Sequence, residues 1–129
     1  MIAQLLYNQT RKRRQARHRQ LSPTTQQNHT MSNFDFLTVS IPEVHQNALK
    51  AESALRIDAP MAAIYSRITL EQLIDYLYRV RSIPLPYGKV DATLNDRLRN
   101  PEFLRLITVP ALTTKMHLIR RIGNDAAHG

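Results

Sequence analysis

The sequence predicts an all-α protein: a small, mostly antiparallel helical bundle of three long helices joined by short helical connectors. The 129 residues are rich in Leu, Ile, Ala and Arg and contain only three glycines, which favours helices over a turn-rich β fold. After residue 40 apolar residues recur at steps of three and four, and strand-like alternation persists nowhere. The length is that of one ordinary domain.

Residues 1–30 differ in composition from the rest of the chain. They hold six Lys or Arg and no acid, whereas residues 31–129 hold 12 basic and 10 acidic residues. Because few bulky apolar residues follow Leu6, we expect a disordered basic arm. One interpretation is a nucleic-acid-binding arm that uses Arg11, Lys12, Arg13 and Arg14. The others are an organellar transit peptide, or upstream sequence before a true start at Met31.

Two long helices are expected next. The first begins at Ser40, because Ser40 and Glu43 have capping-box spacing and Pro42 falls in the first turn. Its apolar stripe comprises Ile41, Val44, Ala48, Ala51 and Leu55. The second is capped near Asp58 and runs to about Arg81. Its apolar residues cover more than one face, so we expect it to be the central helix, with neighbours on two sides.

The connectors and the last helix follow from turn and cap signals. The segment IPLPYG at 83–88 predicts a loop, because its prolines cannot continue a helix. Short helical turns are expected over 93–98 and after the pair Asn100-Pro101. The last helix starts near Pro110, and its buried stripe comprises Leu112, Met116, Ile119, Gly123 and Ala126 or Ala127. Gly123 on this stripe would permit close approach of a neighbouring backbone.

Four polar residues share one side of the last helix. At about 100° per residue they fall within an arc of roughly 60° opposite the apolar stripe; this polar strip comprises His117, Arg121, Asn124 and His128. Arg can hold a phosphate bidentately, His can move protons near neutral pH and Asn can fix an oxygen. The strip could therefore act on a phosphodiester or grip a nucleotide. The plain alternative is the solvated face that any amphipathic helix needs.

Other chemistry is restricted by what the sequence contains. There is no cysteine, and hence no disulfide, thiolate zinc site or thiol nucleophile. His117 and His128 are about 16 Å apart along the helix axis, too far to share one metal ion, so we expect no metal and no cofactor. The apolar runs are too short to cross a bilayer, so we expect no membrane partner.

Two further groups of residues have alternative interpretations. Arg67 and Glu71 are spaced i, i+4 and can form an ion pair within their helix. Alternatively, Glu71 aims at the last helix and pairs with Arg120 or Arg121. Three tyrosines near the end of the second helix are typical of a core edge, with a base-stacking platform as the alternative; they are Tyr76, Tyr78 and Tyr87.

Several stretches within residues 31–129 resemble segments of a known family. They read MSNFDFL, IPEVHQNALKAESAL, RITLEQLIDYLY, IPLPYG, NPEF and MHLIRRIGNDAAHG. Together they resemble the N-terminal helical domain of type I restriction endonuclease R subunits, a family of unknown function grouped with the HEPN superfamily of helical nucleotide- and RNA-associated domains. The closing RRIGNDAAHG is the most specific part. The resemblance implies a HEPN-like helical domain over 31–129.

The resemblance also implies a function. It indicates an accessory domain for DNA restriction in the cytoplasm, acting through other restriction-system subunits, a second copy of the chain, DNA or RNA. HEPN ribonucleases use an Arg and a His separated by four to six residues; here six residues separate Arg121 from His128, and Asn124 matches the family's polar residue. The alternative function is therefore a metal-independent ribonuclease, or an RNA- or nucleotide-binding domain, that acts as a dimer.

Full-length R subunits carry further modules after such a domain. These are a restriction nuclease and an ATP-driven translocase, and neither fits within 129 residues. We therefore expect the chain to be a fragment, a truncated product or a detached domain that is not itself a site-specific deoxyribonuclease.

Overall fold

The computed structural model describes residues 31–129, so the arm predicted for residues 1–30, with Arg11, Lys12, Arg13 and Arg14, lies outside the described residues. The elements run in the order η1 (Asp35–Leu37), α2 (Pro42–Ala54), α3 (Ala59–Val80), η2 (Pro86–Gly88), α4 (Leu94–Arg99), α5 (Pro101–Leu104) and α6 (Pro110–His128). All regular structure in this part of the chain is helical, which confirms the all-α prediction.

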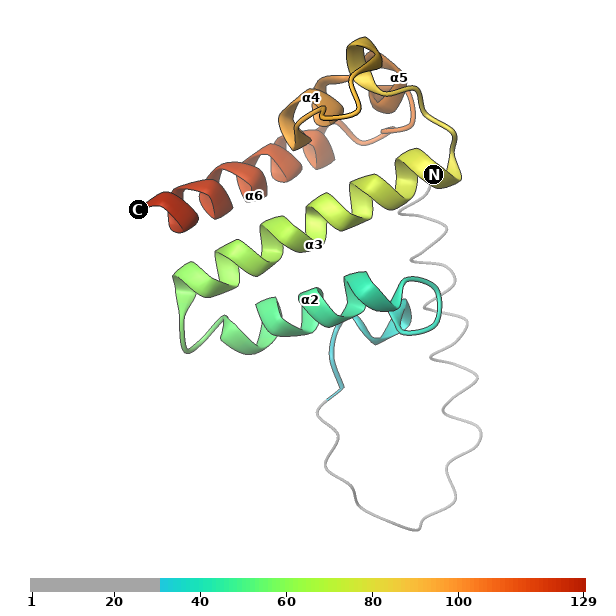
Figure 1. The fold of residues 1–129 in the computed structure, drawn as a ribbon. Helices are drawn as coiled ribbons and strands as arrows, with labels where there is room; N and C mark the ends of the chain where they lie inside the picture. The colour runs from blue at the N-terminus through green and yellow to red at the C-terminus, as the bar shows by residue number, and fades with distance from the viewer. Residues whose placement is uncertain (1–30) are drawn as a thin grey trace, which may run out of the picture.

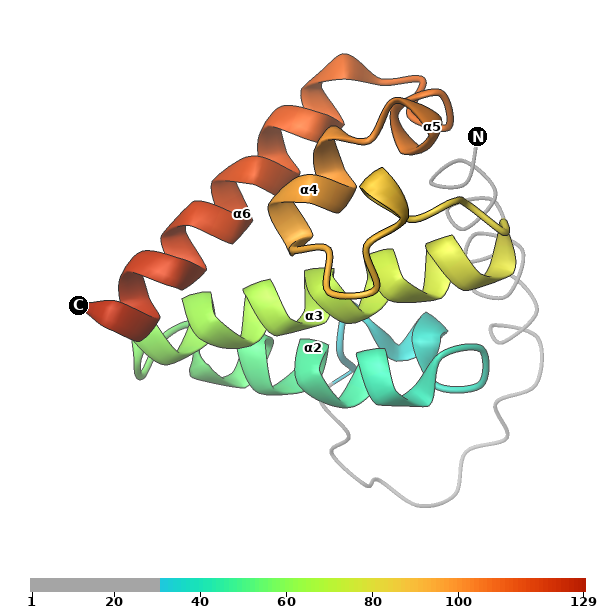
Figure 2. The ribbon, with the colours of Figure 1, turned by 45° about the horizontal axis from the view of Figure 1, so that its top comes forward.

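The three long helices lie side by side. α2 and α6 both run antiparallel to α3, which packs against each of them (Figure 1). α4 contacts both α6 and α3 and lies between them where the two long helices diverge (Figure 2). The predictions of a mostly antiparallel bundle and of a central second helix are confirmed.

Local capping signals set the ends of three helices as predicted. The Asp58 carboxylate accepts a hydrogen bond from the backbone N–H of Met61 at 3.0 Å and caps α3. Thr93 and Asp96 form a reciprocal capping box at the start of α4, and Asn100 caps α5. Each side chain satisfies helix donors that would otherwise lack a partner.

The first long helix departs from the prediction at both ends. Ile41, not Ser40, is the N-cap of α2, and no side chain caps this end. The Ile41 N–H donates to the carbonyl of Leu37 at 2.9 Å, and Ile41 is 3% exposed. The predicted Ser40 cap is wrong because burial of Ile41 decides where the chain turns into the helix. Leu55, predicted on the buried stripe, lies just past the end of α2 and is 67% exposed.

α3 buries two faces in two separate clusters. One face packs with α4, α5 and α6 in a cluster of Leu70, Ile74, Tyr78, Leu94, Leu98, Phe103 and Met116. The opposite face contributes Leu73 and Tyr76 to a cluster with Leu37, Ile41 and Val44 from η1 and the start of α2. Burial of apolar surface on both sides is the main force that holds the central helix in place.

Gly123 marks the close crossing of α6 over α3. A Cβ at this position would lie 2.9 Å from the backbone oxygen of Ala63 and would overlap the Cβ of Arg67. The predicted close approach is confirmed, with Met116 and Gly123 buried on the stripe and Ala127 exposed beyond it. Among residues 31–129, no helix combines the length and apolar character needed to cross a membrane.

Candidate functional site

The polar strip divides between two environments. Arg121 and His128 are exposed, whereas His117 and Asn124 are half-buried. A single polar side opposite the apolar stripe requires one buried side of the last helix, but α6 contacts α4 as well as α3. His117 lies near Arg99 of α4, so this second neighbour takes His117 partly out of solvent. Only Arg121 and His128 are fully available to a partner.

Arg121 and His128 lie on the same side of α6. They are seven residues apart, which is two helical turns and about 10 Å along the axis. α6 continues as a regular helix to His128, where the Gly129 N–H donates to the carbonyl of Asp125 at 2.8 Å. A guanidinium and an imidazole placed in this way can each donate a hydrogen bond to a phosphate oxygen.

Three basic side chains come together where α4 meets α6. Arg99 is at the end of α4, while His117 and Arg120 are i, i+3 neighbours on α6; we call these three residues the basic cluster. Burial, and then the positive charges of Arg120 and Arg99, lower the pKa of His117. His117 is therefore mostly neutral at pH 7 and can accept as well as donate a hydrogen bond. The buried Nε of Arg120 has no hydrogen-bond partner.

One carboxylate accompanies the basic cluster. Asp96, three residues before Arg99, is held by its capping bonds with Thr93, which are the main reason that its pKa is lowered. The charges of Lys89 and Arg99 lower the pKa of Asp96 further. Asp96 therefore offsets part of the charge of Arg99, while Arg120 contributes its charge on the α6 side.

Glu71 pairs with arginines of α3 and α4 and not with an arginine of the last helix. It lies 3.7 Å from Arg67 within α3 and 3.6 Å from Arg97 of α4, measured between charged side-chain atoms. The predicted pair within the helix is confirmed, and the alternative pairing with Arg120 or Arg121 is wrong. The physical reason is that Arg97 of α4 occupies the space beside Glu71. Arg67 itself packs under Gly123, with its Nε buried and without a partner.

Arg97 is a buried charged residue that was not predicted from the sequence. It is 8% exposed and forms ion pairs with Asp75 and Glu71 of α3. Burial lowers the pKa of Arg97, and the charge of Glu71 opposes this effect. The available signal was its place in the pattern, between Leu94 and Leu98 on the buried side of α4. Arg97 joins α4 to α3 and thereby holds Arg99 in position beside α6.

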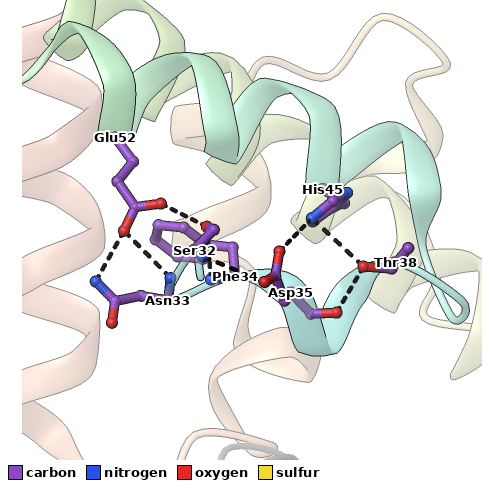
Figure 3. A network of polar contacts seen from close by, with 7 residues as sticks. All are labelled: Ser32, Asn33, Phe34, Asp35, Thr38, His45 and Glu52. Carbon is purple, nitrogen blue, oxygen red and sulfur yellow. Dashed lines mark hydrogen bonds and ion pairs between the residues drawn. The ribbon is translucent and has the colours of Figure 1, made fainter. Parts of the chain in front are cut away.

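A second polar network fastens the start of the described chain to α2 (Figure 3). The Glu52 carboxylate accepts hydrogen bonds from the Ser32 hydroxyl and, at 2.8 Å, from the Asn33 side chain. Its pKa is lowered, chiefly by the bond from Ser32. Nearer the start of α2, His45 contacts Asp35 at 3.2 Å. These bonds hold the segment before α2 against it, and no sequence motif indicated them.

The three tyrosines do not form a stacking platform. Tyr78 is 5% exposed and belongs to the core, where its ring stacks on Phe103 with 5.8 Å between centroids. Tyr76 is half-buried in the other cluster, and only Tyr87 is exposed, at 88%. In the described part of the chain, no three His, Cys, Asp or Glu side chains gather in a way that could hold a metal ion.

No family model, curated protein or solved structure matches this chain. The resemblance to the N-terminal domain of type I restriction R subunits therefore stays a prediction, and α6 with the adjoining basic cluster is the surface on which a function can be argued.

Proposed function

We propose that residues 31–129 form an accessory domain of a type I restriction system that works in the cytoplasm and contacts nucleic acid through α6. The exposed position of Arg121, on a helix with three Lys or Arg and one acid, is the observation that carries this proposal. Arg99 and Arg120 of the basic cluster add positive charge on the neighbouring surface where α4 meets α6. The link to restriction comes from the sequence resemblance alone.

The contact follows from ordinary phosphate chemistry. A guanidinium donates parallel hydrogen bonds to phosphate oxygens and releases counterions from the nucleic acid. If Lys115, Arg120 and Arg121 neutralise two or three phosphates, they contribute about −2 to −3 to the log–log slope of affinity against salt for duplex DNA. Binding of this kind is independent of base sequence and positions the domain without specifying a site.

The test measures duplex DNA binding by the full chain over a range of salt concentrations. We expect Arg121→Gln to weaken binding to different sequences equally and to reduce the salt slope by about one. Arg105→Gln is the matched control, because it removes the same charge from an exposed side chain that already pairs with Glu102 at 2.8 Å. A salt slope for Arg121→Gln equal to that of the unchanged chain would exclude α6 as the contact.

The restriction assignment has its own test. We expect the chain to co-elute with the methylase–specificity complex of the same restriction system in size-exclusion chromatography, and the Arg105→Gln variant to do the same. Elution as separate species, or ATP-dependent DNA cleavage by the chain alone, would contradict an accessory role.

The alternative function is a metal-independent ribonuclease that acts as a dimer. The observation in its favour is that Arg121 and His128 are both exposed on one side of α6, so a cation and a proton-transfer group could reach one strand. Labelled RNA is incubated with the unchanged chain and with His128→Ala in the presence of a metal chelator. Cleavage that is lost in the variant supports this function, and equal cleavage, or none in either protein, excludes it.

A further inference from the structure

The loop between α3 and α4 displays one aromatic side chain to solvent. Tyr87 lies in η2 and is 88% exposed. Its φ is 55°, and Ser82 at the other end of the loop has a φ of 50°. Left-handed backbone is unfavourable for residues with a side chain, and it persists only where the surroundings enforce it. Both views place η2 beside α5 and away from the C-terminal end of α6 (Figures 1 and 2).

Buried contacts hold the loop in this left-handed conformation. The side-chain amide of Asn100, which is 8% exposed, donates to the carbonyl of Pro84 at 2.9 Å and to the hydroxyl of Tyr78 at 3.2 Å. Pro86 is buried directly before the tyrosine, and the Lys89 N–H donates to the Pro86 carbonyl at 3.1 Å. The loop is therefore fixed in place, so little conformational entropy is lost when a ligand meets the Tyr87 ring.

Along the chain, the residues that precede and follow this loop carry mostly positive charge. Arg79, Arg81 and Lys89 are exposed, and Asp91 is the one acid between residues 79 and 92. Leu85 and Val90 on the same loop are 39% and 92% exposed, and cations precede and follow these apolar residues in the sequence. An open aromatic ring on a fixed loop, with cations close to it in the sequence, is a combination that can bind unpaired bases by stacking and their phosphates by charge.

We propose that Tyr87 stacks on an unpaired base of single-stranded nucleic acid, with Arg81 and Lys89 contacting the adjoining phosphates. Duplex DNA keeps its bases stacked on one another and leaves the ring without a partner. This loop is a different surface from the polar strip on α6, so the inference stands if the α6 contact fails. An apolar pocket of a protein partner would have to desolvate the charged residues of the loop, whereas the phosphates of a single strand attract them. We therefore favour single-stranded nucleic acid over a protein as the ligand of Tyr87.

The first experiment uses the absence of tryptophan from the sequence. Tyr87→Trp places a single indole at the tip, and stacking on a base quenches its emission. We expect oligo(dT) to quench Tyr87→Trp strongly and a duplex of the same length to leave it nearly unchanged. Val90→Trp is the matched control on the same loop, and it should respond weakly. Equal quenching of the two variants, or no quenching of either, would overturn the proposal.

The second experiment measures affinity for fluorescent oligo(dT) with the full chain. Loss of one stacked base weakens binding by about five-fold or more, so we expect that loss for Tyr87→Ala and nearly full affinity for Tyr87→Phe. The loss should persist at high salt, because stacking is not screened as phosphate contacts are. Unchanged affinity of Tyr87→Ala would exclude stacking.

Tyr87→Gly separates binding from folding. Glycine accepts the left-handed backbone without strain, so this variant should melt at a temperature no lower than that of the unchanged chain and still bind oligo(dT) as weakly as Tyr87→Ala. A Tyr87→Trp emission that shifts to the blue with phosphatidylglycerol vesicles, but is not quenched by oligo(dT), would assign the loop to a membrane surface instead.

Discussion

Replacing Gly123 with Ala tests the close crossing of α6 over α3. In an open helix interior this change stabilises a protein by about 1 kcal/mol, because Ala has the higher helix propensity. At this position the new methyl group would lie 2.9 Å from the Ala63 oxygen and 3.1 Å from the Cδ of Arg67, and would overlap the Cβ of Arg67. Propensity and packing therefore make opposite predictions about the same substitution.

The packing effect should be the larger of the two. Overfilling a packed interface costs about 1–3 kcal/mol, and this site is at the upper end because a backbone oxygen and a Cβ cannot move away by rotation of a side chain. After the gain in propensity is subtracted, we expect Gly123→Ala to destabilise the fold by about 1–2 kcal/mol. That corresponds to a fall in Tm of roughly 5–15 °C.

Urea denaturation followed by circular dichroism measures the difference. We expect a lower midpoint and an unchanged slope, since the fold stays the same. Thr114→Ala, at an exposed position on the same helix, should be neutral or slightly stabilising. Arg67→Ala keeps the obstructing Cβ. Gly123→Ala should therefore lower the stability of the Arg67→Ala variant by most of the amount by which it lowers that of the original protein. A Gly123→Ala variant as stable as the original would refute this account of the crossing.

Three further changes test the polar contacts. Arg97→Met should lower stability by about 1–3 kcal/mol in urea denaturation, less than for a fully buried ion pair because its carboxylate partners are partly exposed; an unchanged midpoint would show that the ion pairs do not join α4 to α3. Tyr78→Phe should cost about 1–2 kcal/mol, since its hydroxyl donates to the Arg97 carbonyl at 2.7 Å and accepts from Asn100; a thermal melt that matches the unchanged protein would contradict this. The pKa of Glu52 is lowered in the folded state, so its stabilisation is present above the usual pKa of a glutamate and is lost as pH falls through the lowered value. Glu52→Gln should therefore reduce the acid dependence of the thermal midpoint, and an identical dependence in both proteins would show that this carboxylate contributes nothing.

Local signals allowed most helix bounds to be predicted. The Asp58 cap placed the start of α3, and the Asn100-Pro101 pair placed the start of α5, because each depends on residues within one turn. The Ser40 cap failed at a point where Ile41 contacts a second element. Burial of an apolar side chain there outweighs a hydrogen bond that water can replace.

The candidate site was only partly predictable. Periodicity placed Arg121 and His128 on one side of the last helix, and both are exposed. It did not indicate that His117 would be half-buried beside Arg99, nor that Glu71 would meet Arg97. These outcomes depend on where α4 packs, and α4 is too short for its own periodicity to indicate that.

Composition and local pattern by themselves determined that the described chain is helical, where most of its helices start and which stripes they bury, since capping and amphipathicity act over a few residues. Tertiary structure alone decided that Arg97 is buried against Asp75 and that Tyr87, unlike Tyr78, is displayed on a fixed loop. The reason is that the environment of a side chain is set by whichever segments pack around it, and those segments lie far away along the chain.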